Sequence, residues 1–280
     1  MIKKILVALD PDTDTPVATR YAVDIAQRYD AEVTGLAVVD MGSIEASSRG
    51  GGIGSMYLME KVQANLTAEA RTVARRLTDA FRVAMKEHGV AFDVQVEEGV
   101  PFERIVEDMK YHDLLVVGKE PHFFYSHPEE KTDTLVGVVK KTIGPTLVVP
   151  ERYRPVNRVL IAYDASSASA RAVRRLVHLQ PFGTDLSVEI LNIHGKGERE
   201  GSQLALQMAK SYMDAHGYSA HTSSIHGSDP AYEIVEYAKQ YEADVVVAGA
   251  HSVSKIAKLA FGSTTASLLK NCPVPLFLDN

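Results

Sequence analysis

The 280-residue chain contains no tryptophan and a single cysteine, Cys272. One cysteine excludes an internal disulfide framework and favours a reducing compartment. The longest apolar runs, such as residues 114–118 and 245–250, are far shorter than the roughly 20 residues that cross a bilayer, so we expect no membrane-spanning segment. The N-terminus has a basic pair but no apolar segment with a small-residue cleavage site. We therefore expect no signal peptide and a cytoplasmic location.

An excess of basic charge is also missing. Residues 1–150 contain 17 Lys and Arg against 23 Asp and Glu, a net charge of −6, and residues 151–280 contain 13 of each kind. Neither half has the charge of a duplex-binding surface, which argues against a nucleic acid partner. The remaining composition, 45% apolar and 24% charged, is that of a globular protein, and the length suggests about two domains.

The two halves of the chain repeat each other. Four blocks recur in the same order: 4–10 with 158–164, 99–106 with 227–235, 113–118 with 244–249, and 140–149 with 269–278. This self-similarity indicates a tandem duplication. We expect one domain over residues 1–150 and a second over residues 156–280, with the junction near the two prolines of segment 150–155.

Each copy alternates short β-branched runs with amphipathic segments. The expected strands are 5–9, 33–39, 92–96, 114–118 and 146–149 in the first copy, and 159–163, 186–193, 221–225, 245–249 and 276–278 in the second. The longest expected helices are 57–88 and 202–216. This alternation predicts an α/β fold with a five-stranded parallel sheet flanked by helices in each copy. The glycine- and serine-rich stretch 42–55 is expected to be a surface loop.

Parallel α/β sheets bind ligands at the carboxyl ends of their strands. In the second copy Gly249 ends a strand, and Gly262, Ser263 and Thr264 open a helix 13 residues later. Backbone N–H groups at a helix N-terminus bind phosphate oxygens, and neighbouring hydroxyls add donors. On this segment alone, a phosphate site and a simple helix cap by Ser263 or Thr264 are equally good interpretations.

The full pattern resembles a tandem universal stress protein over both halves. Nucleotide-binding members of that family carry Gly, two residues, Gly, nine residues, then Gly-Ser or Gly-Thr. Here Gly249 is followed after two residues by Ser252 and, after nine more, by Gly262 and Ser263. Serine keeps the backbone amide of the missing glycine but adds bulk, so weakened binding is expected. The resemblance implies adenine nucleotide α-hydrolase-like (Rossmann-like) domains and an ATP site in the second one.

The same resemblance implies roles for individual residues. Asp164 would face the ribose or the adenine, Ala162 would line the adenine pocket, and Ile193 would offer backbone groups to the base. The phosphates would lie on Gly249, Ser252, Gly262, Ser263 and Thr264. Any Mg²⁺ would come with the phosphates, held by them and by Ser263. Asp164 also has an interpretation as the N-cap of the following helix, and the two roles are compatible.

The first copy departs from the motif. Gly118 to Asp133 spans 15 positions instead of 13, and Asp133 and Thr134 stand where Gly-Ser belongs. An aspartate there would repel phosphate, so we do not expect the first copy to bind ATP in this way. His122 and His127 suit neither one helix face nor one strand face, and no metal site is expected.

These observations favour a cytoplasmic stress-response protein that binds ATP in its second domain as a sensor or regulator. No residue stands out as a base or nucleophile, so efficient catalysis is not expected, and slow ATP hydrolysis stays open. The second hypothesis is a nucleotide-free interaction module, or scaffold. The resemblance further implies association of the two copies through their last strands as an intramolecular pseudo-dimer. Pairing of two chains into a homodimer stays open.

Overall fold

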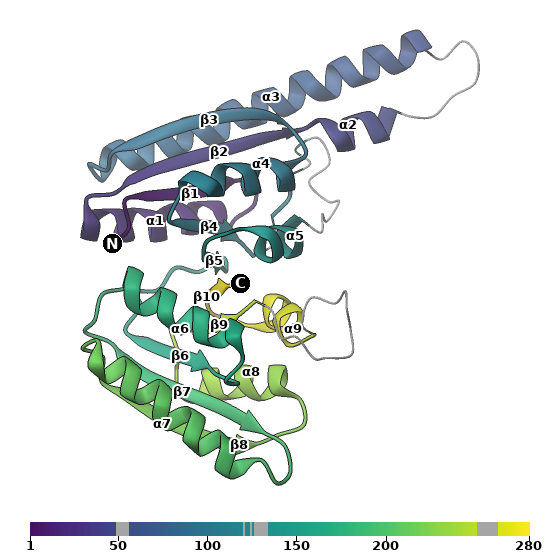
Figure 1. Cartoon of the computed structure of the whole chain (residues 1–280). Coiled ribbons are helices and arrows are strands. Elements are labelled where there is room, and N and C mark those ends of the chain that lie inside the picture. Colours follow the sequence, from purple (N-terminus) through teal and green to yellow (C-terminus); the bar gives the residue numbers. More distant parts are fainter. Residues whose placement is uncertain (49–55, 120, 124, 126–133, 251–262) are drawn as a thin grey trace. The chain divides into compact units, whose positions relative to one another are not determined.

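The computed structural model describes residues 1–48, 56–119, 121–123, 125, 134–250 and 263–280. The chain divides into two compact units (Figure 1). The first unit is residues 3–138, and the second unit is residues 1–2 together with residues 139–280.

The first unit is built on four parallel strands. These are β1 (Lys4–Leu9), β2 (Glu32–Asp40), β3 (Phe92–Gly99) and β4 (Leu114–Gly118), in the order β3-β2-β1-β4. Its helices are α1 (Thr15–Tyr29), α2 (Met41–Ser48), α3 (Met56–Glu87) and α4 (Pro101–Asp108), followed by the short 3₁₀ helix η1 (Met109–Tyr111). Helix α5 (Thr134–Lys141) begins in this unit and ends in the second. Helix α3 is longer than the strands and runs on past them beside α2 (Figure 1).

The second unit contains six strands. They are β5 (Thr146–Val149), β6 (Arg158–Ala162), β7 (Ser187–His194), β8 (Ala220–His226), β9 (Val245–Gly249) and β10 (Leu276–Asp279), in the order β5-β10-β9-β6-β7-β8. Strands β6 to β10 pair in parallel with their neighbours, and β5 pairs antiparallel with β10. The helices are α6 (Ser167–Leu179), α7 (Arg199–Ala215), α8 (Pro230–Gln240) and α9 (Ser263–Asn271).

The sequence explains the central strands directly. All five residues of β4 are buried, as are five of the six residues of β1, because a parallel strand with helices on both faces has no face left for water. Helix α6 buries one side only, including Ala172, Val173, Leu176 and Val177, at the spacing of one helix face. The α/β fold expected from the sequence is therefore confirmed. The last strands of the two repeats, β5 and β10, pair with each other inside the second unit.

One expectation about local structure is wrong. Residues 41–48, the first part of the stretch expected to be a surface loop, form helix α2, and residues 49–55 lie outside the described part of the chain. Asp40 supports the start of α2, because its carboxylate accepts hydrogen bonds from the Ser43 N–H at 3.0 Å and the Ser43 hydroxyl at 2.6 Å. This is how an N-cap residue satisfies the free donors of a first turn, and it outweighs the cost of Gly42 inside the helix.

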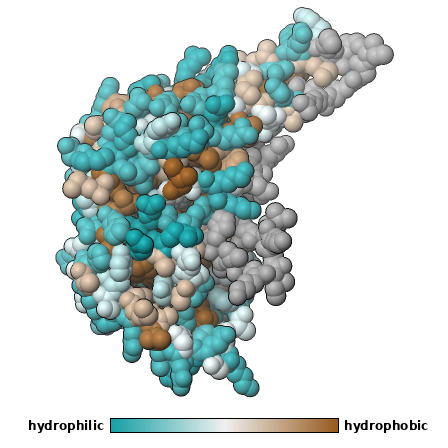
Figure 2. All heavy atoms as spheres, in the orientation of Figure 1, coloured by the Kyte–Doolittle hydropathy of each residue, from teal (hydrophilic) through white to brown (hydrophobic). Residues whose placement is uncertain are grey.

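The described helices include none that is both long enough and apolar enough to span a bilayer. The face drawn in Figure 2 is covered mostly by hydrophilic residues, with hydrophobic residues in small separate groups.

Candidate functional site

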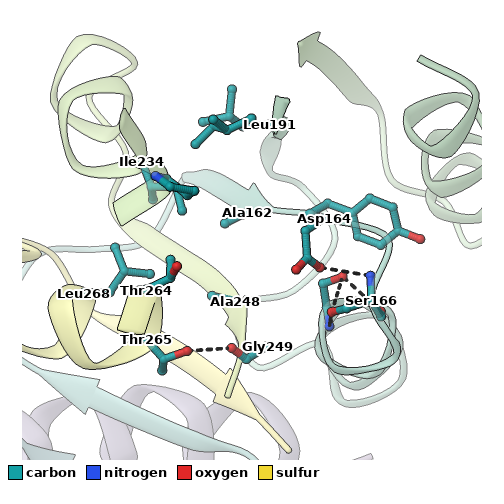
Figure 3. A pocket seen from close by; sticks show the side chains of 14 residues that line it. Ala162, Asp164, Ser166, Leu191, Ile234, Ala248, Gly249, Thr264, Thr265 and Leu268 are labelled. Carbon is teal, nitrogen blue, oxygen red and sulfur yellow. Dashed lines mark hydrogen bonds between the residues drawn. The ribbon is translucent and has the colours of Figure 1, made fainter. Parts of the chain in front are cut away.

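The second unit holds a cavity of about 210 Å³ where strands β6, β7 and β9 end (Figure 3). Its lining consists of Ala162, Tyr163, Asp164, Ser166, Ser169, Leu191, Ile193, Pro230, Ile234, Ala248, Gly249, Thr264, Thr265 and Leu268. These residues come from three strand ends and from the starts of helices α6, α8 and α9. The cavity therefore lies at the edge of the sheet where parallel α/β folds place their ligands.

A tight turn after β6 places Asp164 at the cavity. Ala165 adopts a left-handed conformation with φ of 61°, and the Asp164 Oδ1 atom accepts the Ser166 N–H at 3.0 Å. The Ser166 side chain in turn accepts the Ser169 N–H at 3.2 Å and caps helix α6. The cap of α6 is thus Ser166, while Asp164 stabilises the turn before it and presents its carboxyl group to the cavity.

Gly249 allows strand β9 to meet the start of helix α6. A Cβ atom at this position would lie 2.6 Å from the carbonyl carbon of Ala168 and from the nitrogen of Ser169. Both are backbone atoms, so no side chain can move aside, and only glycine fits without shifting the helix. The Gly249 carbonyl accepts the Thr265 hydroxyl at 3.2 Å, which ties the end of β9 to the first turn of α9.

Helix α9 contributes its N-terminus to the site. It begins at Ser263, which is exposed, and Thr264 lines the cavity on the side opposite Asp164 in the view of Figure 3. The first N–H groups of an α-helix have no partner within the helix and carry the positive end of its dipole. This end of the cavity therefore offers donors that suit an anion.

Another part of the wall is apolar and has backbone groups at its edge. Ala162, Leu191 and Ile234 form part of this wall (Figure 3). The Tyr163 N–H donates to the Leu191 carbonyl at 2.9 Å, so the backbone of Leu191 points toward β6. Backbone groups two residues apart in a strand point the same way. Those of Ile193 therefore point beyond the end of β6, where they are available to a ligand.

The lining carries little charge. Asp164 is its one carboxylate, and no Lys, Arg or His is among the described lining residues. Burial raises the pKa of the Tyr163 phenol, and the Asp164 charge raises it further, so this hydroxyl stays protonated at neutral pH. An anion at this site would be bound by backbone N–H and hydroxyl groups rather than by basic side chains.

The structure brings most of the expected site residues together. Ala162, Asp164, Ile193, Gly249 and Thr264 all line the cavity, and Ser263 begins the adjoining helix. Two other expected residues, Ser252 and Gly262, lie outside the described part of the chain.

Sequence reasoning missed several lining residues, among them Tyr163, Leu191, Ile234 and Thr265. They belong to no motif. Tyr163 and Leu191 could have been found by their position at the strand ends, whereas Ile234 lines the cavity only because α8 packs beside it.

Of the two histidines considered for a metal, the structure describes His122 but not His127. The His122 Nδ1 atom pairs with Asp12 at 2.6 Å, while His112 contacts the Asp108 carbonyl at 2.7 Å and the Thr34 hydroxyl at 3.0 Å. Among the described residues, no three His, Cys, Asp or Glu side chains form a group that could hold a metal ion. His127 lies outside them.

Comparison with known proteins agrees with this architecture. Residues 1–150 and residues 155–278 each match the universal stress protein family. The chain belongs to the universal stress protein family. It contains two domains of that family in tandem, as the internal repeat predicted.

Two relatives of this universal stress protein match over the whole chain. Universal stress protein Slr1230 of Synechocystis is 24% identical over 293 aligned residues, which cover 98% of this chain and 99% of the relative. The crystal structure of a universal stress protein from Archaeoglobus fulgidus covers 99% of this chain and 98% of its own, with a TM-score of 0.71 and 15% identity. The second likeness shows the fold alone.

Some solved members of the family are complexes. One universal stress protein was solved with cAMP; it covers 45% of this chain, with 23% identity and a TM-score of 0.38. Another, from Arabidopsis thaliana, was solved with AMP bound; it covers 44% of this chain, with 16% identity and a TM-score of 0.36. These ligands are properties of those two proteins.

Proposed function

We propose that the second unit binds an adenine nucleotide, ATP, and that the protein acts as a sensor or regulator. The observation that carries the proposal is the cavity at the ends of β6, β7 and β9, which combines apolar side chains with the N-terminus of α9. A nucleotide has matching parts, a flat base and an anionic tail.

The size of the cavity assigns the parts of the ligand. At about 210 Å³ it is smaller than the roughly 300–1,000 Å³ of most ligand pockets. We expect it to take the base and the sugar, with the backbone of Ile193 at the base and Asp164 at the base or the sugar. The phosphates would lie at the rim, on Gly249 and the first turn of α9.

Among the described residues, the lining of the cavity does not form a magnesium site. Mg²⁺ in proteins is usually held by one or two carboxylates together with substrate phosphates. Asp164 is the one carboxylate in the described lining, and one of its oxygens already accepts the Ser166 N–H. Any Mg²⁺ would therefore arrive with the nucleotide, held by its phosphates and by Ser263 in this proposal.

The site supports binding rather than rapid catalysis. Asp164 is engaged in the turn after β6, and Tyr163 is held protonated, so neither is poised as a base for water. A turnover on the order of 1 per second, ordinary for an enzyme, would contradict a purely regulatory role.

A charge at the start of α9 tests the proposal. Ser263→Asp places a carboxylate where the phosphates are proposed to bind, and Asp is favourable at a helix N-terminus, so folding should be retained. We expect ATP affinity, measured by calorimetric titration, to fall by about tenfold or more, which corresponds to about 1.4 kcal/mol or more. Ser263→Asn has nearly the same shape without the charge and should keep an affinity close to that of the unchanged chain.

The result separates the two hypotheses for function. Equal ATP affinity in the Asp and Asn variants would show that the phosphates do not bind at α9. No binding of ATP to the unchanged chain would reject the proposal and favour the alternative, a nucleotide-free interaction module.

A further inference from the structure

The first unit contains a counterpart of the cavity wall in the second unit. In the first unit Ala8 of β1 pairs with Leu36 of β2, and in the second unit Ala162 of β6 pairs with Leu191 of β7. The repeat aligns Ala8 with Ala162 in the sequence as well. Two residues further along, Val38 therefore holds in the first unit the place that Ile193 holds in the second.

A tyrosine side chain occupies these backbone groups in the first unit. The Tyr125 hydroxyl donates to the Leu9 carbonyl at 2.7 Å and accepts the Val38 N–H at 3.2 Å. Tyr125 is only 4% exposed. One phenol thus binds both strand ends at the level where the second unit has an open cavity lined by Tyr163 and Ile193.

The residues next to Tyr125 in the chain are also buried and help to fill the space at these strands. Phe123, two residues earlier, is 1% exposed, and the Tyr125 N–H donates to the Phe123 carbonyl at 3.1 Å. Pro121 is buried as well. Burial raises the pKa of the Tyr125 phenol, so it remains a neutral donor at every physiological pH. The segment therefore fits its place with an aromatic ring and a hydroxyl that is fully hydrogen-bonded.

The charge of the first unit opposes an anionic ligand at the same edge. The loop between β1 and α1 carries three carboxylates, those of Asp10, Asp12 and Asp14, where the loop between β6 and α6 carries Asp164 alone. Gly118 ends β4 as Gly249 ends β9, and a Cβ atom on Gly118 would collide with the Asp14 carboxylate. A phosphate approaching this strand end would meet the carboxylates of Asp12 and Asp14.

We propose that the first unit carries a self-occupied counterpart of the nucleotide cavity, in which the Tyr125 ring takes the place of a bound base. Removing the ring opens a pocket for an uncharged planar aromatic molecule of the same size with one polar group, such as phenol. The comparison with a base rests on the proposed function of the second unit. That Tyr125 fills the position in the first unit does not depend on that proposed function.

Phenol, which matches the side chain removed by Tyr125→Ala, tests the proposal directly. We expect the full-length Tyr125→Ala chain to unfold at a lower temperature, and phenol to raise that temperature with increasing concentration, because a ligand that binds only the folded state stabilises it. Benzene should raise it less than phenol does, because benzene cannot bond to the Leu9 carbonyl and the Val38 N–H.

Tyr125→Phe and the unchanged chain are the controls. Both keep a ring in the pocket, so any phenol effect on them would come from elsewhere, such as the open cavity of the second unit, and should be smaller than the effect on Tyr125→Ala. Equal phenol effects on the Tyr125→Ala chain and on the controls would overturn the proposal. Because all three chains keep the cavity of the second unit, the difference between them reports on the Tyr125 pocket, and its absence is distinct from a failure of the unchanged chain to bind ATP.

A second measurement keeps the proposal testable if Tyr125→Ala does not fold. Hydrogen exchange of the Val38 amide can be compared between the unchanged chain and Tyr125→Phe, which lacks only the hydroxyl. We expect several-fold faster exchange in the variant, because the amide loses its acceptor. Unchanged protection would show that the hydroxyl is not the partner of this amide.

Discussion

At the residue scale, the two units differ most in the acidic residue that follows the first strand of each repeat. Asp164 is exposed and stabilises a turn beside the cavity, whereas Asp10 is fully buried. The Asp10 Oδ1 atom accepts the Asp12 N–H at 2.8 Å, and Oδ2 has no hydrogen-bond partner in the described structure. Burial raises the pKa of Asp10 well above its ordinary value, and the nearby Asp14 charge raises it further.

The raised pKa of Asp10 predicts a specific pH dependence. A carboxyl group whose pKa is higher in the folded state binds more protons there, so stability falls as pH rises from the ordinary value, about 3.9, through the raised value. Asp10→Asn removes this titration while keeping the Oδ1 acceptor. We expect its midpoint of thermal unfolding to rise relative to the unchanged chain as pH increases from about 4 to 8.

The control for this experiment is Asp93→Asn, which removes an exposed carboxylate from the same unit. Its difference from the unchanged chain should not grow with pH in the way expected for Asp10→Asn. Parallel pH profiles for Asp10→Asn and the unchanged chain would show that folding does not raise the pKa of Asp10.

At the scale of the elements, helix α2 shows how one capping residue overrides composition. The segment after β2 is rich in glycine and serine, which is typical of a loop. Yet Asp40, which is 6% exposed, accepts two hydrogen bonds from Ser43 and starts a helix. A short polar residue before the first helical turn was the signal in the sequence that could have predicted α2.

Loss of this cap should be measurable. Asp40→Ala leaves the Ser43 N–H without its acceptor, and we expect the free energy of unfolding to fall by about 1 kcal/mol. Asp40→Asn keeps an acceptor oxygen, so its free energy of unfolding should fall by less than that of Asp40→Ala. Urea unfolding of the three chains would measure the difference, and equal stability of Asp40→Ala and the unchanged chain would show that the cap contributes nothing.

At the scale of the whole molecule, the two similar repeats differ in whether the ligand position at their strand ends is open. The second unit has an open cavity, and the matching position of the first unit is filled by Tyr125. The last strands of the two repeats pair antiparallel, with Phe277 of β10 opposite Leu147 of β5. That pairing is in keeping with the pseudo-dimer expected from the resemblance, while the homodimer and the cytoplasmic location stay predictions.

A single proposed nucleotide site, the cavity of the second unit, predicts one nucleotide per chain. We expect freshly purified protein to release adenine nucleotide near this ratio on denaturation, measured by ion-pair chromatography. The chain contains no tryptophan, so bound nucleotide should also appear as excess absorbance at 260 nm. If none is released, titration with ATP should still give one site. Two sites would contradict the proposal that Tyr125 fills the counterpart cavity of the first unit. No site would favour the hypothesis of a nucleotide-free interaction module.

The sequence by itself determined the architecture. Short apolar runs, amphipathic helices and an internal repeat were enough for the α/β fold and the tandem organisation, because these depend on periodic burial along the chain. It also pointed to Asp164 and Gly249, since strand ends and a glycine before a helix are visible as local patterns, and the family resemblance added Ala162. Each of these features lies within one or two neighbouring elements.

Only the tertiary structure decided which repeat has an open cavity. Tyr125 is 116 residues away from Leu9 in the chain, and nothing in its neighbourhood shows that its hydroxyl will bond to two strand ends. Leu191 and Ile234 likewise reach the cavity through packing rather than through a motif. Whether a pocket is empty depends on which side chains meet in space, and a linear pattern does not record that.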